Sequence, residues 1–127
     1  MTQTDTPHAA LALLDKKQAL EQAGGNRELA CDLFSMLLEE LPVLQSQLAQ
    51  ALEHGEQDAM WDPAHKLYGS TAYCGVPALR EAARAMEECI KQQQADQLQS
   101  CFDRLSREIT RLQEQGAALA EQLRAEN

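Results

Sequence analysis

Apolar residues recur at helical spacing along this chain and predict five helices. Near the start, Asp15 and Gln18 have the spacing of a capping box, and Gly24-Gly25 follows as a stop signal. The first helix is therefore expected to be short, over residues 15–23. The segment before it is polar, and residues 1–13 are expected to be a tail or linker.

A stripe of leucines predicts a much longer second helix. Asn26 is suited to cap this helix, because an Asn side chain accepts a hydrogen bond from the free N–H groups of the first turn. The helix is expected to end at about Glu53. Its expected core positions recur at steps of four and three: Leu29, Leu33, Leu37, Leu41, Leu44, Leu48 and Leu52.

The third predicted helix, over about residues 56–75, carries a histidine on its polar side. At about 100° per residue, the apolar positions of the segment share one arc, and His65 lies nearly opposite to it. The arc consists of Met60, Ala64, Leu67, Thr71 and Cys74. Gly69 and Ala72 lie on the side of the histidine, so little side-chain bulk is expected beside the imidazole. Since glycine within a helix costs about 1 kcal/mol relative to alanine, this gap indicates room for another molecule.

Two more helices complete the pattern. Pro77 suits the first turn of a fourth helix, which is expected to end near Gln92-Gln93-Gln94. The last helix is expected over about 95–124, with apolar residues at heptad spacing. It is longer than the bundle needs, so its C-terminal part is expected to extend beyond the core, where its spacing would allow a homodimer. The expected core stripe of the fourth helix is Leu79, Ala82, Ala83, Met86 and Ile90.

These elements predict an all-α fold. An antiparallel four-helix bundle with a short additional N-terminal helix, in one domain over residues 14–127, buries the predicted stripes most simply. The composition agrees, because helix formers dominate and aromatic residues make up only 4%. No Cys-x-x-Cys pair is present, so no metal site is expected and the cysteines are interpreted as small buried apolar residues. They are Cys31, Cys74, Cys89 and Cys101.

The charge of the chain excludes one large class of partner. Twenty acidic residues against eleven lysines and arginines give a formal net charge of -9, which repels a phosphate backbone. A nucleic-acid partner is therefore not expected. No apolar run approaches the roughly 20 residues that span a bilayer, and the N-terminus does not have the pattern of a signal peptide. A cytoplasmic location is expected, with no membrane contact by this segment.

The segment around the histidine resembles a known family. It reads His65-Lys66-Leu67-Tyr68-Gly69, and Gly75 follows ten residues after the histidine. This pattern is similar to that of histidine-containing phosphotransfer (HPt) domains, and the similarity covers residues 14 to about 105. The run from Tyr73 to Pro77 most resembles the HPt module of BarA/GacS-type hybrid sensor kinases.

The resemblance implies a phosphoryl carrier in a two-component phosphorelay. His65 would accept the phosphoryl group of an aspartyl phosphate on a response-regulator receiver domain and pass it to another receiver. An exposed imidazole is substantially neutral, and hence nucleophilic, near pH 7. The family implies that Mg²⁺ belongs to the receiver and that this chain binds no cofactor. Since the sequence shows no Gly-rich phosphate loop and no second catalytic group near His65, no ATP site or kinase activity of its own is expected.

Three neighbours of the histidine are expected to support the phosphoryl group or the partner: Lys66, Tyr68 and Gly69. The family commonly has Lys three residues after the histidine, and this chain has Tyr68 there. Lys66, the Tyr68 hydroxyl or charges of the partner would therefore have to neutralise the phosphoryl group.

Four side chains on the third and fourth helices are candidates for docking a receiver: Trp61, Ala72, Arg80 and Arg84. A structural role is the alternative for three of them. Trp61 could instead lock its helix to the bundle, and the two arginines could pair with glutamates of their own helix.

The sequence is also compatible with two other functions. One is a helical bundle that binds receivers or dimerises without carrying phosphate, which Tyr68 favours and the intact His65 and Gly69 disfavour. The other is a metal or cofactor bundle, which would need inward-facing Glu-x-x-His pairs. The sequence contains no such pair.

Overall fold

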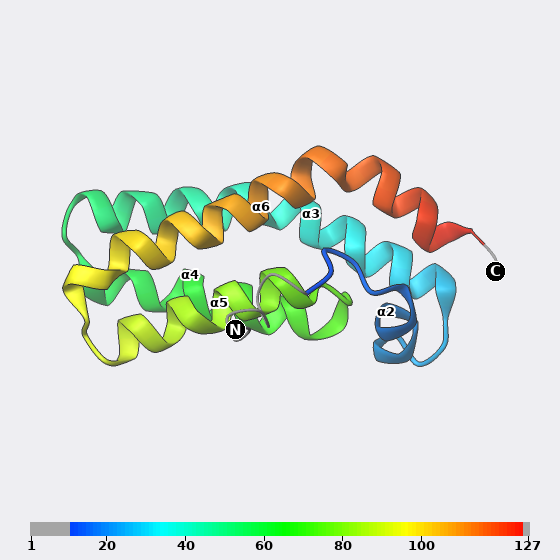
Figure 1. The fold of residues 1–127 in the computed structure, drawn as a ribbon, viewed down its shortest axis with the longest axis horizontal. Helices are drawn as coiled ribbons and strands as arrows, with labels where there is room; N and C mark the ends of the chain where they lie inside the picture. The colour runs from blue at the N-terminus through cyan, green and yellow to red at the C-terminus, as the bar shows by residue number, and fades with distance from the viewer. Residues whose placement is uncertain (1–10, 126–127) are drawn as a thin grey trace, which may run out of the picture.

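The computed structural model describes residues 11–125, and over that range the chain forms helices and 3-10 turns without a strand. The elements are α2 (Lys16–Gln22), α3 (Arg27–Glu53), η1 (Gln57–Met60), α4 (Trp61–Ser70), η2 (Thr71–Tyr73), α5 (Pro77–Lys91) and α6 (Ala95–Arg124). The helices α3, α4, α5 and α6 run alongside one another, and α2 lies at one end of this bundle (Figure 1). The predicted all-α bundle with a short additional N-terminal helix is confirmed.

Capping residues begin the first two helices as predicted. The Asp15 side chain accepts a hydrogen bond from the Gln18 backbone N–H at 3.0 Å, and the Asn26 side chain accepts one from the Leu29 N–H at 3.0 Å.

Most of the predicted tail, residues 1–10, lies outside the described residues, while Leu13 packs against the core. The predicted third helix is α4 with a 3-10 turn at each end, an arrangement common at helix termini.

The stripes predicted for the third and fourth helices form the core. All five stripe positions predicted for the third helix and all five predicted for the fourth are buried. On α3 the prediction is wrong at the N-terminal end, where Ala30 and Phe34 are buried and Leu29 is 42% exposed. The leucines from Leu41 back to Leu29 are spaced by fours, and each step of four rotates the position by about 40° on a helix with 3.6 residues per turn. The leucine stripe therefore leaves the buried face over this length.

The C-terminal part of α6 packs on α3 instead of extending beyond the core. The Gln113 side chain donates to the Leu38 carbonyl at 3.0 Å, and Gly116 leaves the space that the Leu38 side chain fills. Leu119 and Leu123 are buried in the same core. Heptad spacing alone does not reveal whether a partner helix belongs to the same chain. Because the heptad positions of α6 are covered by other parts of the same chain, a homodimer would have to form through other side chains.

The segment that contains α2 is hydrogen-bonded to Gly75, in the connection between α4 and α5. The Asp15 N–H donates to the Gly75 carbonyl at 2.8 Å, and the Gly75 N–H donates to Gln22 Oε1 at 2.9 Å. Gly75 has a φ of 63° and packs directly against Ala19. This contact fixes the end of the helix that carries the histidine.

No helix in residues 11–125 has both the length and the apolar character to cross a membrane.

Candidate functional site

His65 lies on the outer face of α4, and its side chain is 62% exposed, as predicted. Its Nδ1 lies 2.5 Å from Oε2 of Glu87 on α5. Because a carboxylate only accepts hydrogen bonds, this contact places the ring hydrogen on Nδ1. Nε2 is then the ring nitrogen that carries the lone pair whenever the ring is neutral.

The contact between His65 and Glu87 was not predicted from the sequence. A helical wheel describes one helix, and Glu87 belongs to the next one, so the wheel of the histidine-bearing helix does not contain it. A signal was present in the sequence. His65 and Glu87 lie at similar distances along the chain from Gly75, and such positions meet when two helices form an antiparallel pair.

One face of the imidazole is covered by Trp61. The two rings are stacked, with centroids 5.1 Å apart and an angle of 13° between their planes. Trp61 lies one helical turn before His65 and also packs against the core. The structural alternative considered for Trp61 is therefore present, together with a direct contact to the histidine that was not predicted.

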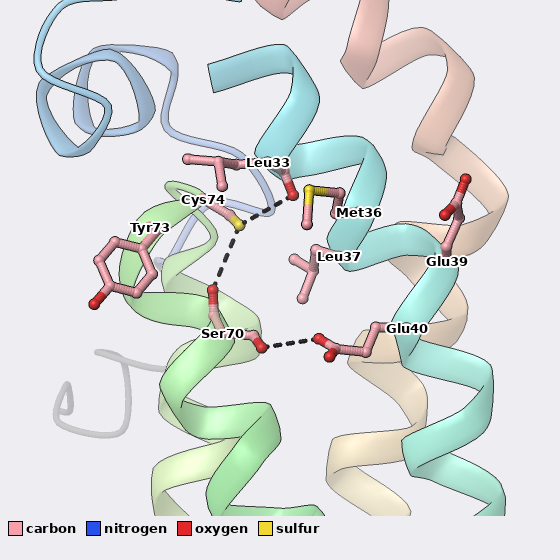
Figure 2. A pocket seen from close by; sticks show the side chains of 8 residues that line it. All are labelled: Leu33, Met36, Leu37, Glu39, Glu40, Ser70, Tyr73 and Cys74. Carbon is pink, nitrogen blue, oxygen red and sulfur yellow. Dashed lines mark hydrogen bonds between the residues drawn. The ribbon is translucent and has the colours of Figure 1, made fainter. Parts of the chain in front are cut away.

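Lys66 extends towards α3. Its Nζ lies 3.7 Å from Oε2 of Glu40, and the other carboxylate oxygen of Glu40 accepts a hydrogen bond from the Ser70 hydroxyl at 2.8 Å (Figure 2). The Lys66 side chain is 65% exposed. An ion pair this exposed contributes little, about 0–1 kcal/mol, so the ammonium group can exchange Glu40 for another anion.

Tyr68 and Arg80 form a unit between α4 and α5. The Arg80 guanidinium lies over the Tyr68 ring, 4.3 Å from its centroid, and donates to the Tyr68 hydroxyl at 3.1 Å. It also donates to the Thr71 hydroxyl at 3.1 Å. Arg84 instead pairs with Glu81, whose hydrogen bond raises the pKa of that guanidinium. Both arginines therefore have partners within the bundle, and only Arg84 has the glutamate partner that was considered.

A groove lies between α3 and the end of α4 (Figure 2). In the sequence, the exposed Gly69 directly precedes the lining residue Ser70, and the half-buried Ala72 directly precedes Tyr73. Met36 and Tyr73 are 62% and 57% exposed at this groove. A Cβ added to Gly69 would meet no atom within 4 Å. Apolar side chains beside open space are features of a contact surface. The groove is lined by Leu33, Met36, Leu37, Glu39, Glu40, Ser70, Tyr73 and Cys74.

Cys74 has a structural role in this groove. Its thiol donates to the carbonyls of Ser70 at 3.4 Å and Leu33 at 3.6 Å. Burial, with a smaller contribution from Glu40, raises the pKa of the Cys74 thiol to about 11, so it is a neutral thiol near pH 7. All four cysteines are free, and no group of three or more potential metal ligands occurs among the residues that the structure describes.

Comparisons with known proteins indicate the family of this chain. Residues 32–115 match the family model described as the Hpt domain. The sensor histidine kinase GacS of Pseudomonas protegens is 36% identical over 80% of this chain, and the signal transduction histidine-protein kinase BarA of Escherichia coli K12 is 35% identical over 63%. The chain spans only 11% and 9% of the lengths of these two kinases.

A solved structure covers nearly the same domain. The crystal structure of the HPT domain from an Hpt sensor hybrid histidine kinase of Shewanella has a TM-score of 0.79 and 30% sequence identity to this chain. The match covers 89% of this chain and 97% of that one. With the family match over residues 32–115, this shows that the chain belongs to the Hpt domain family.

Proposed function

We propose that this chain is a histidine phosphotransfer module of a two-component phosphorelay, with His65 as the phosphoryl acceptor. The observation that carries the proposal is the geometry of His65, which is exposed and held at Nδ1 by Glu87. Membership of the Hpt family and the similarity to sensor kinases support it.

In the proposed step, the Nε2 lone pair of His65 attacks the phosphorus of an aspartyl phosphate on a receiver domain. An N–P bond forms while the P–O bond to the aspartyl group breaks, and the electron pair leaves with the aspartate carboxylate. The imidazole does not have to lose a proton, because the Nδ1 hydrogen stays in its bond to Glu87. The ring becomes a cation whose charge Glu87 balances. Attack by the aspartate of a second receiver reverses the step.

The remaining charge stabilisation is divided between the two proteins. The equatorial oxygens of a transferring phosphoryl group need cationic partners. Lys66 offers an exposed ammonium next to His65 in the sequence, and we assign the Mg²⁺ to the receiver domain. In this proposal the chain is a carrier and has no ATP site of its own.

We propose that the receiver docks over Gly69 and the adjoining groove between α3 and α4. The surface at Gly69 is open, and Met36 and Tyr73 present exposed side chains in the groove. This position brings the partner's aspartyl phosphate to the same face of α4 as His65. The proposed docking surface includes residues of α3. The docking residues expected from the sequence lay only on the third and fourth predicted helices.

The open space at Gly69 gives a test of this docking surface. Gly69→Gln is expected to fold at least as stably as the wild type, because glutamine is a better helix former and its Cβ meets no atom. Its bulk is expected to slow transfer from a phosphorylated receiver at least about tenfold, the effect of a small displacement of the reacting groups. Labelling by phosphoramidate, a small donor that needs no docking, is expected to remain unchanged. Equal rates with the receiver for both proteins would contradict the docking surface.

The proposed function is tested by intact mass after incubation with phosphoramidate and, separately, with receiver domains phosphorylated by acetyl phosphate. The wild type is expected to gain one acid-labile phosphoryl group, and His65→Gln none. His54→Gln is the matched control, because His54 is an exposed histidine at the end of α3, and it is expected to behave as the wild type. Absence of labelling of folded wild type by both donors, or equal labelling of His65→Gln, would refute the proposal and favour a bundle that only binds receivers.

A further inference from the structure

Trp61 has contacts beyond those that a docking residue needs. It is the first residue of α4, and its indole stacks on the His65 ring at 5.1 Å and 13°. It also packs against the core, and with Ile90 and Lys91 it lines a depression between α4 and α5. The bundle therefore holds the indole, and the indole in turn supports an imidazole that is otherwise largely exposed.

Glu87 and Trp61 restrain the ring of His65 in different ways. The hydrogen bond from Nδ1 to Glu87 fixes one point on the edge of the ring. A single such contact still permits the ring to rotate about the axis of the hydrogen bond. The parallel stack on Trp61 opposes that rotation, because tilting the imidazole would separate the two faces. Together the two contacts fix the direction of Nε2.

The stack also bears on the charge that the reaction creates. Attack by Nε2 converts a neutral imidazole into a phosphorylated imidazolium that retains its Nδ1 hydrogen. The face of an indole is the aromatic surface that attracts cations most strongly. Trp61 therefore interacts more favourably with the phosphorylated ring than with the free one.

We propose that Trp61 is a positioning residue for phosphoryl transfer, which orients the His65 ring and stabilises its cationic phosphorylated form. The inference rests on the proposed function of His65. It differs from the docking role expected from the sequence, because the contact acts within the chain and needs no receiver.

The test compares wild type, Trp61→Phe and Trp61→Leu with phosphoramidate as donor, so that docking has no influence on the rate. Trp61→Leu is expected to be labelled about three- to tenfold more slowly, a range between those of an exposed and a desolvated cation–aromatic contact, because Trp61 is half-buried. Trp61→Phe keeps an aromatic face and is expected to stay within about twofold of the wild type. Thermal unfolding of each variant checks that it is folded under the labelling conditions.

The outcomes separate the inference from the proposed function. Equal labelling rates for all three proteins would overturn the positioning role and leave His65 as the acceptor. Slowing of both variants by the same factor would also overturn it, because that pattern indicates lost packing. Absence of labelling of the wild type by phosphoramidate and by phosphorylated receivers would refute the proposed function itself.

A second measurement needs no variant of Trp61. The chain contains a single tryptophan, so tryptophan fluorescence reports on the surroundings of Trp61, which include the His65 ring. Phosphorylation of the wild type is expected to change the emission intensity as the neighbouring ring becomes a cation. The same treatment of His65→Gln is expected to cause no change. Unchanged emission of a fully phosphorylated wild type would overturn the inference.

Discussion

Gly75→Ala is expected to lower the free energy of unfolding by about 2–5 kcal/mol, the combined cost of a strained backbone and an overpacked contact. Gly75 has a φ of 63°, which L side chains rarely adopt. A Cβ there would lie 2.6 Å from both the Cβ and the backbone N of Ala19, and 2.7 Å from the Asp15 carbonyl oxygen. Two of these three atoms are backbone and cannot rotate away. Urea denaturation followed by circular dichroism measures the loss.

Gly55→Ala is the matched control. Gly55 has nearly the same φ, 66°, but a Cβ there meets nothing within 4 Å. It is expected to cost only about 1 kcal/mol, the cost of the backbone conformation. The difference between the two variants measures the contact between α2 and the end of the histidine-bearing segment. Equal destabilisation would show that this contact contributes nothing.

Glu87→Ala is expected to slow phosphorylation of His65 by phosphoramidate about ten- to a hundredfold. The variant loses a hydrogen bond to a charged group, a contribution of about 1.5–3 kcal/mol that becomes strongest as the ring acquires positive charge. Glu87→Gln keeps an acceptor oxygen without its charge and is expected to fall between wild type and Glu87→Ala. Initial labelling rates at constant pH provide the measurement.

The neighbouring Glu88 provides the control for this prediction. It lies on the same helix, is also half-buried, and accepts a hydrogen bond from Gln92 instead of contacting the histidine. Glu88→Ala is expected to be labelled at the wild-type rate. If Glu87→Ala and Glu88→Ala were labelled equally fast, Glu87 would have no part in the reaction.

Features that depend on a single helix could be predicted from the sequence. The caps at Asp15 and Asn26 began helices where expected, and the buried arc of α4 left His65 exposed. The open surface at Gly69 followed from the same wheel. These properties depend on local hydrogen bonding and on the direction of side chains around one axis, both of which the residue pattern contains.

Features that depend on how two helices meet could not be predicted in the same way. The contact of Glu87 with His65 and the stack of Arg80 on Tyr68 require the relative rotation of α4 and α5. The burial of Leu123 requires the path of α6 over the rest of the bundle. Trp61 is a partial exception, because it lies one turn before His65 on the same helix. Its position was predictable, but the choice of side-chain rotamer that brings the rings together was not.

We expect Nε2 of His65 to carry the phosphoryl group while Nδ1 keeps its hydrogen bond to Glu87. Nitrogen-15 NMR of the phosphorylated protein, labelled at histidine, distinguishes the two ring nitrogens, because only the nitrogen bonded to phosphorus shows coupling to phosphorus-31. We expect this coupling at Nε2 of His65 alone. Coupling at Nδ1, or at a nitrogen of another histidine, would refute this assignment.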